Sequence, residues 1–247
     1  MRYLILSDIH ANLEALDAVM TAAGQDGYDK IICLGDIVGY GADPNACVDR
    51  VRGIASSVIR GNHDRACAGL EDLEWFNPVA KAAVVWTTQT LTEVNRAWVE
   101  HLPRGPMAVN GFEIVHGSPA DEDEYVCQVA EASQLTGYLD ADVTFFGHTH
   151  LQGGFAYYRG GVQRIPPLSP DEQRRETVLD PGVRYLINPG SVGQPRDGDP
   201  RASWAVFVPE EHVVVYRRIP YDIAGAAGKI VDAGLPPILA RRLEIGQ

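Results

Sequence analysis

The sequence predicts an α/β protein in which the first third alternates strands with helices and the second half is rich in strands. Tyr3 to Ser7 is a short apolar run, and apolar residues at helical spacing follow from Asn12. The pattern repeats with an apolar strand at Lys30 to Leu34, a loop at Gly35 to Asp43 and a helix that begins at Pro44, because proline is accepted in a first helical turn. Two such units in succession favour parallel strands with crossover helices.

The middle of the chain is predicted to be mostly helical. Ser57 to Ile59 is a third short strand that completes the alternating region. Two helical patterns follow, at Pro78 to Leu91 and Thr92 to Leu102, and Thr92 is a good cap for the second.

The second half carries strand patterns separated by turn residues. Asn110-Gly111 is typical of a hairpin between Met107 to Val109 and Phe112 to Val115. Further strands are expected at Val143 to Phe146, Gly153 to Tyr158, Arg184 to Ile187, Ser203 to Val208 and Val213 to Arg218. Gly160 to Gly182 contains four prolines and several charges, and strand patterns resume after it. We therefore expect one domain over residues 1–247 with an inserted surface loop near 160–182.

Composition limits the class of partner. Of the 247 residues, 45% are hydrophobic and 22% are charged. A chain of this length and hydrophobic content can bury the core of one domain. Lys and Arg number 21 against 33 Asp and Glu, so the net charge is -12. Such a charge repels nucleic-acid backbones, and the sequence has no basic stripe to reverse it, so duplex nucleic acid is disfavoured as a partner.

Cysteine spacing and the N-terminus bear on the compartment. The four cysteines, Cys33, Cys47, Cys67 and Cys127, form no CxxC pair, which argues against a disulfide framework or a zinc knuckle. Asp8 interrupts the first apolar run, which is too short for a signal peptide or a membrane span. The expectation is a cytoplasmic protein with no membrane partner, of an oligomeric state that the sequence does not define.

Four short motifs place metal-binding side chains directly after strand-like runs. They are SDIH at 7–10, GDIVGYG at 35–41, GNHD at 61–64 and GHTH at 147–150. Of the seven histidines, four lie in these motifs, and His116 follows a fifth strand. Since sites form at the carboxyl ends of strands in α/β sheets, the loops are expected to converge on one crevice.

Each motif alone also has an ordinary structural explanation. Asp8 could cap the helix that starts near Asn12, and His116 could be a satisfied, partly buried histidine. GNHD is harder to explain as core, because it places three adjacent polar groups at the end of a buried strand. The five segments together, in this order, favour a metal-dependent active site.

The order of these motifs from Asp8 to His150 resembles that of the calcineurin-like metallophosphoesterases. The later segment NPGSVGQPR at 188–196 resembles their small bacterial and archaeal branch in particular. The resemblance covers nearly the whole chain and implies a four-layer α/β/β/α sandwich with a dinuclear metal centre at the strand ends. It supplies no role for the segment at 160–182 or for the stretch from Tyr221 onward.

The resemblance also implies a ligand set. The first metal would be held by Asp8, His10 and His150, the second by Asn62, His116 and His148, with Asp36 bridging both. A shared carboxylate suits two cations about 3.5 to 4 Å apart, which can hold a hydroxide between them. Mixed nitrogen and oxygen ligation without thiolate fits Mn, Fe, Zn, Ni or Co, and the resemblance favours manganese.

Two residues beside the ligand Asn62 are candidates for catalysis. His63 is the expected general acid, which protonates or hydrogen-bonds the leaving oxygen. Asp64 is expected to orient His63 and hold it cationic, because a neighbouring carboxylate raises an imidazole pKa. The alternative for Asp64 is a structural one, in which it caps the turn after the strand.

Arginines and aromatic residues near the motifs are candidates for substrate binding. Arg60 and Arg196 could each bind a substrate phosphate. Alternatively, Arg60 extends from a strand end into solvent, and Arg196 pairs with one of the aspartates that follow it. Tyr40 and Trp75 could stack on a substrate ring or simply pack.

The leading functional hypothesis is hydrolysis of a small phosphomonoester or phosphodiester by metal-bound hydroxide. A non-catalytic interaction scaffold, like the retromer subunit of this fold, is the alternative, and the full ligand set with His63 argues against it. A nuclease is disfavoured by the net charge of -12. A protein serine/threonine phosphatase resembles this chain only through the shared motifs, and nothing else in the sequence favours that function.

Overall fold

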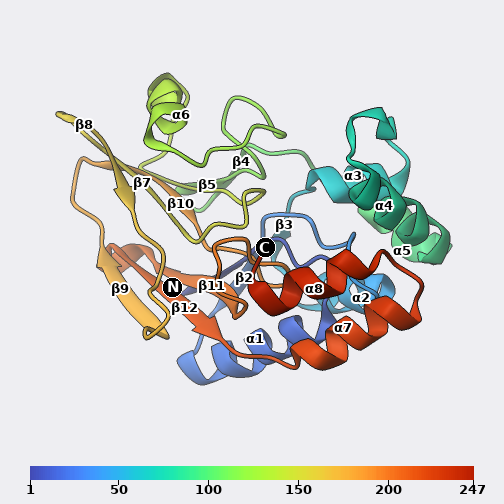
Figure 1. The fold of residues 1–247 in the computed structure, drawn as a ribbon. Coiled ribbons are helices and arrows are strands. Elements are labelled where there is room, and N and C mark those ends of the chain that lie inside the picture. The colour runs from blue at the N-terminus through green and yellow to red at the C-terminus, as the bar shows by residue number, and fades with distance from the viewer.

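Two mixed β-sheets face each other, with helices on their outer sides (Figure 1). The computed structural model describes residues 1–247, apart from the side chain of Trp75. The first sheet has the order β3-β2-β1-β11-β12-β9, with β1 Tyr3–Leu6, β2 Lys30–Cys33, β3 Ser57–Val58, β9 Arg174–Val178, β11 Ala202–Val208 and β12 Val213–Ile219. The second has the order β4-β5-β6-β10-β7-β8, with β4 Met107–Val109, β5 Phe112–Ile114, β6 Val143–Phe145, β7 Gly153–Tyr158, β8 Gly161–Ile165 and β10 Arg184–Asn188.

Parallel strands bring the loops of the predicted site to one edge. In the first sheet, β1 pairs with β2 and β2 with β3 in parallel, in a register that sets Leu4 beside Ile31. In the second sheet, β5 pairs with β6 in parallel, and β6 with β10. The remaining pairings are antiparallel, and β11 joins the first sheet through β1. The carboxyl ends of β1, β2 and β3 therefore share an edge, as do those of β5 and β6.

Helices cover the outer faces of both sheets. The first sheet is covered by α1 Leu13–Asp26 and α2 Pro44–Ile54, and α7 Ile223–Asp232 and α8 Pro237–Ile245 pack alongside. Beyond β3 lie α3 Asn62–Ala68, α4 Pro78–Thr90 and α5 Glu93–Glu100, and the single short helix α6 Val129–Gln134 lies over the second sheet. Short 3₁₀ turns are η1 Leu73–Trp75, η2 Leu135–Gly137 and η3 Pro209–Glu211. The four-layer α/β/β/α arrangement is confirmed.

An apolar core between the sheets holds them in place. Phe112, Phe145 and Phe207 pack their rings with centroids 5.4 to 5.6 Å apart, edge-on or tilted, and all three are buried. Such arrangements contribute beyond buried area alone, by about 0.5 to 1.5 kcal/mol a pair. The core thus gives the loops at the sheet edges a rigid support.

The predicted helices and strands are confirmed, most of them to within one or two residues at each end. Asn12 caps α1 by accepting from the backbone N–H of Ala15 (3.1 Å), and Thr92 caps α5. Among the described residues no disulfide links the cysteines, of which Cys127 alone is half-buried and the other three are buried. No helix in the described part of the chain is both long and apolar enough to cross a membrane.

The prediction of an inserted surface loop at Gly160 to Gly182 is wrong. This segment contains β8, which pairs with β7, and β9, which pairs with β12 of the other sheet. Both are largely exposed edge strands, and β9 carries the charged residues Arg174, Arg175 and Glu176 in succession, so their hydrophobic alternation is weak. The prolines lie between the strands, where no ladder hydrogen bond is required of them.

Candidate metal centre

The side chains that the motifs single out meet where strands of both sheets end. Asp8 and His10 follow β1, and Asp36 follows β2. His116 follows β5, and the pair of histidines in GHTH follows β6. They form two overlapping buried clusters, one of Asp8, His10, Asp36 and His150 and one of Asp36, His116 and His148, with the candidate ligand atoms in each cluster within 4.8 Å of one another. These clusters are consistent with a dinuclear metal site.

Asp36 belongs to both clusters. Its Oδ2 lies 3.5 Å from Nε2 of His10 and 3.5 Å from Nε2 of His116, while its Oδ1 accepts from the backbone N–H of His63 (2.9 Å). One oxygen therefore fixes a neighbouring loop and the other faces both clusters. Burial would raise the pKa of Asp36, but the surrounding imidazoles outweigh it and hold that pKa well below its usual range.

Three imidazoles are oriented by backbone carbonyls. The contacts are His10 Nδ1 to Val38 O (3.1 Å), His116 Nδ1 to Leu34 O (2.8 Å) and His150 Nδ1 to Gln194 O (2.5 Å). Because a carbonyl only accepts, each Nδ1 donates a proton, and the Nε2 atoms of His10 and His150 keep their lone pairs for a cation. Burial lowers the pKa of His116, but the Asp36 carboxylate outweighs it and raises that pKa to about 10, so Nε2 of His116 must lose a proton before it can bind a metal. The Nε2 atoms of His10 and His150 lie only 3.1 Å apart, which brings two such lone pairs together in the first cluster.

His148 is oriented the other way round. Its Nε2 faces the carbonyl of Asp123 (3.1 Å), so Nδ1 has the lone pair. That Nδ1 lies 3.0 Å from Oδ1 of Asn62, which is also 3.3 Å from Nε2 of His116. Three candidate ligand atoms thus converge at the second cluster, and a cation that displaced the proton of His116 Nε2 would be shared by all three.

Asp8 gives a further test of whether the residues fit metal ions. Its Oδ1 accepts from the backbone N–H of His148 (3.1 Å), but its Oδ2 is buried with no hydrogen-bond partner among the described residues. Burial raises the pKa of Asp8 to about 6. A buried, unpaired carboxylate oxygen is costly, and a divalent cation would satisfy it. The donor set therefore fits two metal ions.

The backbone of the centre is strained. Five of the candidate ligands have a positive φ, in the left-handed backbone conformation that residues other than glycine rarely adopt. They are Asp8 (φ 54°), His10 (49°), Asp36 (52°), His148 (62°) and His150 (60°). Residues held in such conformations cost about 1 to 3 kcal/mol each and cluster at functional sites. Five such residues lie in loops that follow strands of the two sheets. The surrounding structure, and not local backbone preference, therefore sets the positions of these side chains.

His63 and Asp64 do not pair in the way the sequence suggests. Asp64 is buried, and its oxygens accept from the backbone N–H groups of Ile37 (2.9 Å), Val38 (3.2 Å) and Gly61 (3.0 Å). Burial lowers the pKa of His63 to about 4, and its Nδ1 has no hydrogen-bond partner among the described residues. No hydrogen bond joins Asp64 to His63 among the described residues, and the three backbone donors hold the carboxylate in the capping role that was the structural alternative.

Arg196 lies at the centre, and its acidic neighbours are engaged elsewhere. Its Nη2 reaches Gln194 Oε1 (3.1 Å) and the hydroxyl of Tyr40 (3.4 Å), and its guanidinium lies 5.7 Å from the Tyr40 ring centroid. Asp197 and Asp199 pair instead with the buried Arg218. The guanidinium is thus held by neutral groups, which leaves its charge available to an anion.

Arg60 is occupied by a protein carboxylate. Its Nη2 and Nε lie 3.1 and 3.3 Å from the two oxygens of Glu122, which also pairs with Arg65. The predicted contact between Arg60 and substrate phosphate would require this two-bond pair to open.

A cleft of about 390 Å³ opens beside the second cluster. Asn62, His63 and His148 line it together with the aromatic residues Tyr40, Phe76 and Tyr125. Sequence reasoning missed Tyr125 and Asp123, because Asp121 to Glu124 looks like a solvated charge run. The signal available was their position in the loop that follows His116.

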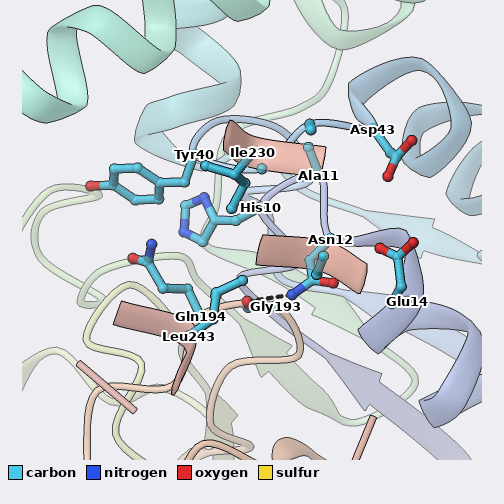
Figure 2. Close-up of a pocket in the computed structure, with 13 residues that line it drawn as sticks. His10, Ala11, Asn12, Glu14, Tyr40, Asp43, Gly193, Gln194, Ile230 and Leu243 are labelled. Carbon is cyan, nitrogen blue, oxygen red and sulfur yellow. Dashed lines mark hydrogen bonds between the residues drawn. The ribbon is translucent and has the colours of Figure 1, made fainter. Parts of the chain in front are cut away.

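The C-terminal helices support the ligand loops from behind. Figure 2 shows a second, small cavity where Ile230 of α7 and Leu243 of α8 approach His10 and Tyr40. On its other side Asn12 donates to the carbonyl of Gly193 (2.9 Å), which ties the loop after β1 to the later glycine-rich loop. The stretch from Tyr221 onward therefore backs the centre.

Comparison with known proteins identifies the family. Residues 1–211 match the calcineurin-like phosphoesterase superfamily domain. The chain belongs to this superfamily. It is 35% identical to an uncharacterized protein of Methanocaldococcus jannaschii over 259 residues, which covers 98% of this chain and 97% of that protein. It is also 25% identical to phosphodiesterase YfcE of Escherichia coli K12 over 210 residues, 81% of this chain and 84% of the relative.

A solved structure extends the similarity over the full chain. The crystal structure of a metallophosphoesterase from Sphaerobacter thermophilus has a TM-score of 0.86 and 41% identity, covering 100% of this chain and 99% of that one. The resemblance to calcineurin-like enzymes of the small bacterial and archaeal branch is confirmed. The chain is a metal-dependent phosphoesterase of this superfamily, with a buried centre of His and Asp side chains.

Proposed function

We propose that this phosphoesterase hydrolyses a small phosphomonoester or phosphodiester with two divalent cations. Asp8, His10 and His150 would hold one cation and Asn62, His116 and His148 the other, with Asp36 shared. The observation that carries the proposal is Asp36 Oδ2, which lies 3.5 Å from an imidazole nitrogen of each cluster. A carboxylate oxygen in this position is suited to bridge two cations.

The donor set limits the choice of cation. Imidazole nitrogens with carboxylate and amide oxygens, and no thiolate, suit Mn, Fe, Co, Ni or Zn, and manganese is our first choice. When bound, two such cations would lower the pKa of a water molecule and balance the charge of a phosphate group. Asn62 adds no charge of its own, so the centre would keep the positive charge that an anionic ester needs.

Two residues would act on the substrate directly. Arg196 would bind a phosphate oxygen, because its guanidinium is held by Tyr40 and Gln194 and not by a carboxylate. His63 lines the cleft and would donate a hydrogen bond to the leaving oxygen. The neutral imidazole that burial favours can still donate through its N–H.

The size of the cleft favours a small substrate, and the construction of the centre favours an active enzyme over a scaffold. A volume of about 390 Å³ fits sites for small molecules, and the net charge of -12 disfavours a long polyanion. A scaffold that binds partners without turnover would need neither the complete donor set nor strained backbone at five of its members.

The test is metal content and turnover of protein reconstituted with Mn. Elemental analysis is expected to give close to two equivalents of Mn per chain. The same protein is expected to hydrolyse p-nitrophenyl phosphate or bis-p-nitrophenyl phosphate. Asp36→Asn should lose more than one equivalent, because this carboxylate serves both clusters. Asp49→Asn, on the surface of α2, is the matched control and should keep both. A wild-type stoichiometry of one or none would contradict the proposal.

A further inference from the structure

We propose that the substrate carries a planar aromatic group, which Tyr125 and Phe76 bind by stacking in the cleft beside the second cluster. The inference rests on the proposed function and adds the chemistry of the group attached to the phosphate. A simple aromatic ring and a nucleobase share that chemistry.

Tyr125 provides an exposed aromatic surface next to the centre. Its ring centroid lies 3.9 Å from that of His148, with the ring planes 38° apart, so the two rings partly stack. The side chain is nevertheless 51% exposed and lines the cleft. The imidazole thus supports one side of the phenol ring while much of its remaining surface is open to a ligand. A planar group on that surface would lie within reach of an ester bound at the second cluster.

Phe76 adds a second ring to the same cleft. Its centroid lies 5.4 Å from that of His63, edge to face at 86°, and the side chain is only partly buried. Tyr125 therefore packs against His148 of the centre, and Phe76 packs against His63. A phosphate ester that reaches His63 and His148 would bring its organic group between these aromatic side chains.

The cleft has room and polarity for more than a phosphate group. Its volume of about 390 Å³ lies within the ~300 to 1,000 Å³ typical of sites for small organic ligands. Two acidic residues line it, but Arg65 pairs with both, with Glu71 at 2.9 Å and with Asp123 at 2.7 Å. Glu122 joins the same cluster through Arg65, Arg60 and Arg104, so three arginines face three carboxylates. The acidic residues of the lining therefore do not exclude an anionic ester. Stacking on aromatic side chains tolerates many planar groups, because every such group presents a π-face.

The experiment keeps the leaving group constant and varies the group that stays on phosphorus. Mn-loaded protein is assayed with p-nitrophenyl methyl phosphate, p-nitrophenyl phenyl phosphate and the p-nitrophenyl ester of thymidine 5′-phosphate. We expect kcat/KM to be about tenfold higher for an aromatic ester than for the methyl ester, as stacking energies of this kind allow. A higher value for the thymidine ester than for the phenyl ester would identify a nucleoside as the preferred group, and the reverse order a simple ring.

Substitutions assign the preference to the two rings. Tyr125→Leu and Phe76→Leu keep apolar bulk but remove the π-face, and each should reduce the ratio of aromatic to methyl kcat/KM to about twofold or less. Tyr138→Leu, at a position that is 57% exposed and outside the cleft lining, is the matched control and should keep the wild-type ratio. Persistence of the tenfold ratio in both cleft variants would overturn the inference.

A binding measurement separates this inference from the proposed function. Calorimetry of Mn-loaded protein with phenylphosphonate and methylphosphonate, which are not hydrolysed, should give about tenfold tighter binding of the phenyl compound. Equal affinities for the two phosphonates would refute the aromatic site while leaving the hydrolase assignment intact. Tighter phenylphosphonate binding without turnover of any ester would uphold the aromatic site and refute hydrolysis.

Discussion

At the scale of single residues, the hydrogen bonds of the imidazoles decide which nitrogen is free. His10, His116 and His150 face a backbone carbonyl with Nδ1, whereas His148 faces one with Nε2. The proton stays on the nitrogen that donates to the carbonyl. His10, His148 and His150, whose pKa values are lowered by burial, therefore enter the centre in the tautomer that a metal requires, whereas His116 must first lose a proton.

His63 is predicted to matter most for poor leaving groups. His63→Ala should retain the metal content of the wild type and lower kcat by roughly 10² to 10⁴ on an alkyl ester, because the leaving oxygen loses its hydrogen-bond donor. The loss should shrink for p-nitrophenyl esters, whose oxygen needs little help to leave. The measurement is steady-state kinetics on both ester types, and full activity on the alkyl ester would rule out this role.

Arg196 is predicted to bind substrate through its planar guanidinium. Arg196→Ala should raise KM by about tenfold with unchanged metal content, and Arg196→Lys should rescue little, because lysine lacks the planar fork. Arg174→Ala is the control, since this arginine lies on the exposed edge strand β9 and pairs with Glu176. The measurement is steady-state kinetics on the alkyl and p-nitrophenyl esters. A wild-type KM in Arg196→Ala would show that Arg196 has no role in substrate binding.

At the scale of elements, Asp64 holds the start of α3 against the loop after β2. Its carboxylate accepts from Gly61 at the helix start and from Ile37 and Val38 in the loop that follows Asp36. Gly61 is required here, because a Cβ at this position would collide with the carboxylate of Asp36. The two loops that carry Asp36 and Asn62 are therefore fixed to each other without help from a metal.

Asp64→Asn is predicted to destabilise the protein itself. The amide group would face a buried N–H that has lost its acceptor, which costs about 1 to 3 kcal/mol. Denaturant unfolding in EDTA measures this loss without any contribution from bound metal. Asp72→Asn, an exposed cap of η1, should change stability by less than about 0.5 kcal/mol. Unchanged stability of Asp64→Asn together with lost turnover would instead restore the catalytic role first expected of it.

At the scale of the whole molecule, the centre lies at the junction of the two sheets. Asp8, His10 and Asp36 come from loops of the first sheet, and His116, His148 and His150 from loops of the second. Contacts already join the loops, since the backbone N–H of His148 donates to Asp8. Cations in the centre would add bonds across the same junction, and the sheets would separate on unfolding only if those bonds broke.

Mn is therefore predicted to raise the thermal midpoint of unfolding. A ligand that binds only the folded state adds about 2.7 kcal/mol at one hundred times its Kd, which corresponds to roughly 5 to 10 °C for a chain of this length. Calorimetry or thermal circular dichroism at increasing Mn, against an EDTA baseline, measures the shift. Asp36→Asn should show a smaller one, and a wild-type midpoint independent of Mn would contradict a centre built across the sheets.

Local patterns in the sequence are enough to predict the helices, the strands and the candidate ligands. Short apolar runs with helical patterns between them are local features, and motifs such as GNHD and GHTH place polar groups where a buried strand ends. The order of those motifs was sufficient to predict the sandwich fold and the family, both of which are confirmed. Nothing in this part depends on contacts between distant segments.

Contacts between groups that are far apart in the sequence depend on how the whole chain folds. Asp64 is adjacent to His63 in sequence, yet besides the nearby Gly61 its partners are the backbone donors of Ile37, 27 residues away, and Val38. Tyr125 stacks on His148 and Arg60 pairs with Glu122 because separate loops converge, and no local pattern encodes such contacts. The same holds for β8 and β9, whose sequences show little hydrophobic alternation and become strands because β7 and β12 offer open edges for backbone pairing.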